Sequence, residues 1–190
     1  MSDINDSDIN EVDASKMPLM AHLVELRQRL IYALLGVAVA FVFCFVVSAE
    51  IFNFLMGPYI AALDGVSGRM IFTGLQDGFM VKIRIGLFGA VCLAFPIIAT
   101  QIWKFVAPGL YRHEKNAFAP FLIATPVLFI IGAALAYYII MPLAWKFLLS
   151  QGIDLGSNIL PVEQEPAVDK YLGLVMKMVL AFGISFELPV

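Results

Sequence analysis

The sequence of 190 residues is 61% hydrophobic and only 14% charged, and its mean hydropathy is +0.89. An average soluble domain carries roughly 25% charged residues, so this composition excludes an ordinary soluble globular protein and indicates an integral membrane protein. The formal net charge of -3 says little about partners, because five of the fifteen acidic residues lie within the first thirteen positions.

Residues 1–16 are acidic and polar and contain few large apolar side chains. Such a segment cannot bury enough apolar surface to fold, so we predict a disordered acidic tail rather than a targeting peptide. Residues 17–190 are expected to form a single transmembrane domain.

Apolar stretches of about 20 residues, the length needed to cross roughly 30 Å of hydrocarbon, dominate the rest of the chain. Four of them lie near residues 30–47, 79–100, 117–140 and 171–190. The fourth is still apolar where the sequence stops, so we expect the chain to be truncated in or at the end of that span. Prolines and glycines recur inside the spans, which predicts an all-α, polytopic bundle of kinked, packed transmembrane helices.

Lysine and arginine near the span ends predict the orientation of the chain. They favour the segment before the first span and the connection between the second and third spans. We therefore expect a cytoplasmic amino terminus, with the two longer connections outside. Lys82 and Arg84, near the outer end of the second span, are expected to extend their charged groups to the interface.

The first outer connection contains apolar residues at helical spacing in IFNFLMGPYIAAL, residues 51–63. Gly57 and Pro58 interrupt this pattern, so it is typical of a broken amphipathic helix that lies on the outer surface. We expect a structured outer, periplasmic cap.

An amphipathic segment, MAHLVELRQRL at residues 20–30, precedes the first span. His22, Glu25 and Arg29 share one helical face in it. Glu25 either pairs only with Arg29 four residues on, a contribution of about 0.2–0.5 kcal/mol, or serves as half of an acidic recognition site for a basic ligand.

A polar cluster, FVAPGLYRHEKN at residues 105–116, separates the second and third spans. One interpretation is a short positively charged cytoplasmic loop with a Pro-Gly turn, in which Glu114 is locally neutralised. The other is that Glu114 and Glu25 converge on one cationic ligand, since each carboxylate can accept a bidentate guanidinium.

Glu187, in FGISFELPV at residues 182–190, lies about sixteen residues into the fourth apolar stretch. A charged group at the centre of a membrane helix costs roughly 2.5–3.5 kcal/mol on insertion scales. We expect Glu187 to be protonated, hydrogen-bonded across helices or exposed to a wet cavity, unless a helix tilt carries it to the inner interface.

Enzyme motifs are absent from the sequence. The two histidines, His22 and His113, both fall near the inner surface, and neither HExxH nor GxSxG occurs. Cys44 and Cys92 lie in the middle of apolar stretches and are expected to behave as small buried hydrophobic residues. We predict no enzymatic activity, no cofactor, no metal site and no binding of nucleic acid.

Three of these stretches together resemble the TatC family, the multi-span core of the twin-arginine protein translocase. They are HLVELRQRL at 22–30, FVAPGLYRHEK at 105–115 and FGISFELPV at 182–190, in the order of the family and between the same spans. The resemblance covers essentially everything after the acidic tail. The family has six spans, so it implies a fifth and a sixth that this sequence does not contain.

The resemblance implies a receptor for signal peptides with consecutive arginines. It further implies that the receptor assembles with the single-span proteins TatA and TatB in an oligomeric complex of the bacterial cytoplasmic (inner) membrane and exports folded proteins with the proton-motive force. It assigns the recognition acids to Glu25 and Glu114, a buried polar contact to Glu187 and a proline of the outer cap to Pro58. The other residues that it places in signal-peptide binding are Arg27, Phe105, Pro108, Leu110 and Tyr111.

A proton-coupled small-solute transporter is the alternative hypothesis. Kinked spans and an intramembrane glutamate would also suit that activity. It predicts binding sites between pseudo-symmetric halves, and the sequence has no evident internal repeat.

Overall fold

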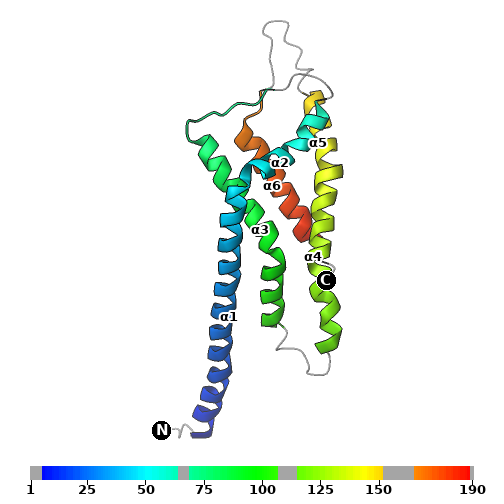
Figure 1. Ribbon diagram of the computed structural model, residues 1–190. Coiled ribbons are helices and arrows are strands. Elements are labelled where there is room, and N and C mark those ends of the chain that lie inside the picture. The colour runs from blue at the N-terminus through cyan, green and yellow to red at the C-terminus, as the bar shows by residue number, and fades with distance from the viewer. Residues whose placement is uncertain (1–5, 64–68, 107–114, 152–164, 189–190) are drawn as a thin grey trace.

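The computed structural model describes residues 6–63, 69–106, 115–151 and 165–188 of the chain. Its elements are helices, confirming the predicted all-α transmembrane bundle with a cap (Figure 1). In chain order they are α1 (Asp6–Val46), α2 (Ser48–Ala62), α3 (Asp77–Val106), α4 (Lys115–Leu135), the π-helix η2 (Ala136–Ile140), α5 (Met141–Gln151) and α6 (Val168–Ser185).

Three helical segments of the described chain are long and apolar enough to cross a membrane, namely Met20–Val46, Asp77–Phe105 and Leu122–Ser150. They overlap the first three predicted spans. The third runs through η2 without a break, since α4, η2 and α5 follow one another directly. Helix α6 takes the place of the fourth predicted span, but Asp169, Lys170 and Lys177 make it more polar than the other three.

Helix α1 begins at Asp6, so residues 6–16 are helical where their composition predicts a disordered tail. Adding residues to an existing helix costs less than nucleating one, and α1 is already nucleated by its apolar part. This effect accounts for the difference.

The helices form two packed pairs, α1 with α3 and α4 with α6, and α2 crosses between them at one end (Figure 1). The beginnings of α3 and α6 lie at that same end, which we call the cap end. A backbone bridge between Ile71 and Ala167 also joins the two connections there. The largest buried cluster lies beneath α2 and contains Leu55, Tyr59 and Met141 among its members.

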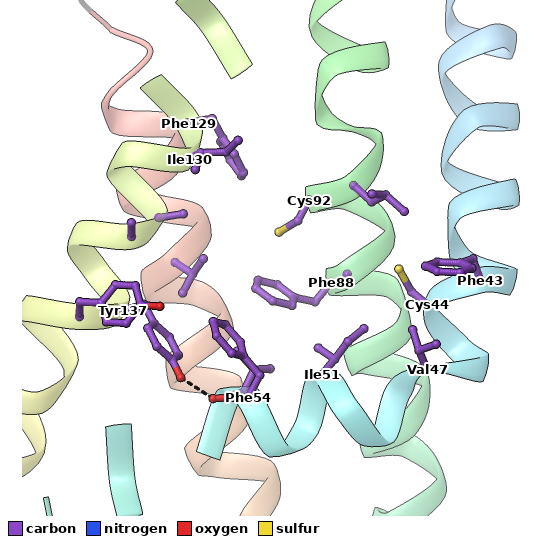
Figure 2. Close-up of a pocket in the computed structure, with 17 residues that line it drawn as sticks. Phe43, Cys44, Val47, Ile51, Phe54, Phe88, Cys92, Phe129, Ile130 and Tyr137 are labelled. Atoms are coloured by element: carbon purple, nitrogen blue, oxygen red, sulfur yellow. Dashed lines mark hydrogen bonds between the residues drawn. The ribbon is translucent and has the colours of Figure 1, made fainter. Parts of the chain in front are cut away.

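Helix α2 is continuous through Pro58, which corrects the prediction of a broken helix. Proline has no N–H, so the carbonyl of Phe54, four residues earlier, loses its helical donor. The hydroxyl of Tyr137 in η2 donates to that carbonyl at 2.6 Å (Figure 2). The hydroxyl of Tyr171 in α6 donates to the neighbouring carbonyl of Leu55 at 2.8 Å. Tertiary contacts thus supply what the proline removes.

An apolar cavity of about 540 Å³ separates the two helix pairs beneath α2. Figure 2 shows the sulfur atoms of Cys44 and Cys92 on this side of α1 and α3. Both thiols are free; Cys44 is buried and Cys92 is half-buried. Gly57 keeps α2 close to the opposite pair, because a Cβ there would lie 2.7 Å from the hydroxyl oxygen of Tyr137.

Candidate functional site

The first candidate site is a pocket of about 400 Å³ between α1 and α3, at the end of the bundle opposite the cap. We call it the Glu25 pocket. Glu25 lies on α1 and is joined there by Gln28, Arg29 and Tyr32, and α3 adds two polar side chains from its last two turns, Gln101 and Lys104. The helical spacing of the α1 residues accounts for their common face.

The carboxylate of Glu25 is half-buried, and its two oxygens have different partners. The guanidinium of Arg29 donates to Oε1 from both Nε, at 3.1 Å, and Nη2. Nδ1 of His22 lies 4.0 Å from Oε2, beyond hydrogen-bonding distance. One oxygen is therefore held by the protein, while the other retains capacity to accept a hydrogen bond from a ligand.

The wall beside this carboxylate includes a stacked ring pair. The rings of His22 on α1 and Phe105 on α3 lie 4.2 Å apart with an interplanar angle of 17°. This contact brings Phe105 to the face of α1 that carries Glu25. Gln28 also donates to the hydroxyl of Tyr32 at 3.2 Å, which orders the pocket's α1 face.

The structure places the other predicted binding residues differently. Arg27 is exposed on α1 and does not line the Glu25 pocket. Four further residues, Pro108, Leu110, Tyr111 and Glu114, lie outside the described residues. Gln101 and Lys104 were not singled out in the sequence; polar residues one turn before the end of an apolar span are the signal that could have identified them.

A second candidate site surrounds Glu187, which lies in the turn that follows α6 rather than inside the helix. Its carboxylate faces the side chain of Thr125 and the backbone of Phe129, both on α4. Its Oε1 is buried and has no hydrogen-bond partner within the described part of the chain. Trp103 on α3 donates through its indole N–H to the hydroxyl of Thr125 at 3.3 Å. We call these three residues, Glu187, Thr125 and Trp103, the Glu187 cluster.

Close packing of α4 on α6 positions this carboxylate. A Cβ on Gly132 would lie 2.5 Å from the carbonyl oxygen of Phe182, and one on Gly183 would lie 2.6 Å from the ring of Phe129. Small residues allow such close approach between membrane helices. Sequence analysis missed Thr125 and Trp103, because each is far along the chain from Glu187 and no local pattern links them.

Pro58 is buried in α2 at the cap end, far along the bundle from the Glu25 pocket. Within the described ranges no group of three or more His, Cys, Asp or Glu side chains could hold a metal ion. Glu25, Glu187 and Pro58 thus lie in three separate places: the Glu25 pocket, the Glu187 cluster and the cap.

The comparisons with known proteins agree with one another. The family model described as Sec-independent protein translocase protein (TatC) matches residues 21–190. The protein of that name from Magnetococcus marinus is 45% identical over 175 residues, covering 92% of this chain and 62% of the relative. Its counterpart from Escherichia coli is 35% identical over 176 residues, with 91% and 64% covered. The chain thus spans less than two thirds of the length of these relatives.

Solved structures give the same result for the fold. A crystal structure of the twin arginine translocase receptor TatC superposes with a TM-score of 0.77 at 37% sequence identity, covering 88% of this chain and 71% of that chain. A second crystal structure of such a receptor, in DDM, gives a TM-score of 0.75 at the same identity, with 88% and 72% covered.

Proposed function

The chain belongs to the TatC family, and from that premise we propose that it forms the signal-peptide-binding core of a twin-arginine translocase. In this proposal it acts with TatA and TatB to export folded proteins across the bacterial cytoplasmic membrane, its amino terminus is cytoplasmic, and it has no enzymatic activity. The resemblance to a solved twin-arginine translocase receptor supports the receptor role.

The observation that carries the proposal is that the two carboxylate oxygens of Glu25 have different surroundings. Arg29 holds Oε1, whereas among the described residues no charged group donates a hydrogen bond to Oε2. A ligand guanidinium can therefore donate to Oε2 while Arg29 keeps the carboxylate in place. A ligand guanidinium could bind both oxygens of Glu25 only if Arg29 released Oε1. The geometry therefore favours a single hydrogen bond from the ligand to Oε2.

The remainder of the Glu25 pocket suits a second arginine. Gln101 supplies an amide oxygen in the pocket. The stacked rings of His22 and Phe105, which lie beside Glu25 but do not line the pocket, offer an aromatic face on which a guanidinium can lie. Glu114 is the second recognition acid in this proposal. Arg27, Pro108, Leu110 and Tyr111 are assigned to the same surface from their positions in the family motifs.

The test is the affinity of the protein, in nanodiscs, for a labelled peptide with two consecutive arginines and for its twin-lysine counterpart. An ammonium cannot stack on an aromatic face while it donates to a carboxylate as a planar guanidinium can, so the twin-arginine peptide should bind more tightly. Glu25→Ala and Glu114→Ala should each weaken its binding by about 10-fold or more, as expected when a charge-assisted hydrogen bond of about 1.5–3 kcal/mol is lost.

Glu50→Ala is the matched control, since it removes an exposed acid at the cap end of the molecule. It should leave the affinity unchanged. Equal binding of both peptides that is insensitive to Glu25 and Glu114 would contradict the receptor proposal and favour the proton-coupled transporter instead.

We also propose that Glu187 contacts a polar group on the membrane helix of a partner subunit, TatA or TatB. Glu187 as a whole is only half-buried, so a polar group on a partner's membrane helix can hydrogen-bond to the accessible part of its carboxyl group. Trp103, also half-buried, lies nearby through its hydrogen bond to the buried Thr125.

A further inference from the structure

A groove of about 730 Å³ runs between α3 and α6, beginning near the cap end. It is separate from both the Glu25 pocket and the Glu187 cluster. Three cations line it, Arg84 from α3 with Lys170 and Lys177 from α6, together with one carboxylate, Asp169. We call it the α3/α6 groove.

The cations of the groove have no ion-pair partner in the part of the chain that the structure describes. Arg84, Lys170 and Lys177 are all exposed. Arg84 interacts with Asp77 through charge alone, without an ion-pair contact. Charged side chains on membrane helices are costly unless they reach water or an opposite charge. Three cations against one carboxylate leave the groove with an excess of positive charge.

Asp169 adds a second requirement. Its carboxylate lines the groove together with the three cations. A carboxylate accepts hydrogen bonds, so a ligand that fits the whole groove should present both a negative charge and a hydrogen-bond donor beside it.

The rest of the groove is apolar. Leu87 and Leu174 on its walls are 51% and 41% exposed. Gly173 leaves space between them, because a Cβ there would meet no atom within 4 Å. An apolar slot that starts at a cluster of cations matches the outline of a phospholipid, with its headgroup at the interface and an acyl chain along the helices.

We propose that the α3/α6 groove binds one anionic phospholipid, with a hydroxyl-bearing headgroup, from the leaflet at the cap end. Its phosphate faces Arg84, Lys170 and Lys177, a headgroup hydroxyl donates to Asp169, and an acyl chain lies beside Gly173. Basic pockets between membrane helices recognise headgroups in this way. The volume falls within the roughly 300–1,000 Å³ typical of small-molecule sites. This inference is independent of the proposed receptor function.

The experiment is native mass spectrometry of the protein released from detergent, titrated with phosphatidylglycerol, phosphatidylcholine or phosphatidylethanolamine. One phosphatidylglycerol should bind at a lower concentration than either zwitterionic lipid. Inorganic phosphate at matched concentration should not displace it, because phosphate has no acyl chain to occupy the apolar part of the groove.

Substitutions locate the site. Arg84→Gln, Lys170→Gln and Lys177→Gln should each reduce the preference for phosphatidylglycerol by about fivefold, the effect of one basic residue at a membrane surface. Lys82→Gln is the matched control: Lys82 is an exposed cation on the same helix, but its ammonium lies over the ring of Phe45, 5.0 Å from the centroid.

A steric pair of variants tests the acyl slot. Gly173→Leu should fill it and weaken phosphatidylglycerol binding without a clash inside the protein. Gly78→Leu is its control, because Gly78 also has open space around it but does not line the groove.

Three outcomes would overturn the proposal. Equal binding of phosphatidylglycerol and phosphatidylcholine would show that charge is not recognised, and equal binding of phosphatidylethanolamine would show that a net negative headgroup is not required. Phosphatidylglycerol binding that is unchanged when Arg84→Gln, Lys170→Gln and Lys177→Gln are combined would show that the lipid binds elsewhere. The groove would then be a site for a protein helix.

Discussion

At the scale of single residues, the buried oxygen of Glu187 carries the greatest energetic consequence. Its Oε1 lacks a partner in the described chain, and Thr125 beside it already accepts a hydrogen bond from Trp103. The threonine hydroxyl can still donate one hydrogen bond, but a carboxyl group has two oxygens to satisfy. Glu187 as a whole is only half-buried, so a neighbouring subunit can hydrogen-bond to the accessible part of its carboxyl group.

Glu187→Ala should weaken the association of the protein with TatB and TatA by about 3- to 30-fold, the range expected from an interhelical hydrogen bond of roughly 0.6–2 kcal/mol. Glu187→Gln should keep much of the association, because an amide can still donate and accept. Co-purification from membranes at graded detergent concentrations measures the difference.

Leu188→Ala, one position on and strongly exposed, is the control for truncating a side chain in this turn. If Glu187→Ala left both assembly and export at the level of this control, the assigned partner contact would be wrong.

At the scale of elements, two tyrosines attach α2 to the bundle, and one of them, Tyr137, replaces a missing helical hydrogen bond. The Tyr137 hydroxyl donates a hydrogen bond to the Phe54 carbonyl, to which Pro58 cannot donate because it has no N–H. Tyr137 belongs to the π-helical turn η2. Such a turn often orients a side chain in a direction that a regular α-helix would not allow.

Tyr137→Phe should destabilise the protein in detergent by about 1 kcal/mol, the usual net value of a hydrogen bond. In a Pro58→Ala background the cost should fall, because alanine restores an N–H donor to Phe54. The resulting coupling between positions 58 and 137 is measured by a double-mutant cycle of unfolding free energies.

Tyr138→Phe is the matched control, since the hydroxyl of this exposed neighbour makes no hydrogen bond to α2. Additive effects of Pro58→Ala and Tyr137→Phe would rule out the compensation described here.

The same helix shows how far sequence reasoning extends. Span positions and the Glu25–Arg29 pair follow from local periodicity, and the structure contains both. The continuity of α2 does not follow from local periodicity, because the hydroxyl that donates to the Phe54 carbonyl lies 83 residues away in the chain. The stacking of His22 on Phe105 and the Trp103–Thr125 hydrogen bond are likewise non-local. Local patterns predict elements, whereas the partners of orphaned polar groups depend on tertiary packing.

At the scale of the whole molecule, two helix pairs stand side by side and are tied by α2 at the cap end (Figure 1). Large apolar side chains along α1 remain exposed, including Leu34, Val39 and Val46. Lipid or partner helices must cover them, because no soluble protein exposes so continuous an apolar surface. The bilayer is therefore part of the solvent that this fold requires.

Orientation in the bilayer follows from charges near the span ends, and here the cations of the α3/α6 groove matter. Arg84, Lys170 and Lys177 belong to the cap end and offset the excess of basic residues at the opposite end. They reduce the bias set by the basic residues of the connections, which still favours one orientation. The expected orientation is a cytoplasmic amino terminus with the cap outside.

Cysteine labelling in whole cells tests this orientation. The background lacks Cys44 and Cys92, and the cells have a permeabilised outer membrane and an intact inner membrane. A membrane-impermeant maleimide should then label Arg69→Cys, because the Arg69 side chain is 80% exposed on the cap side. Met20→Cys, exposed near the amino end of α1, should react only after the inner membrane is opened. Labelling in the reverse order would place the Glu25 pocket outside the cell. A cytoplasmic signal peptide could not reach it there, so this single result would also remove the receptor proposal.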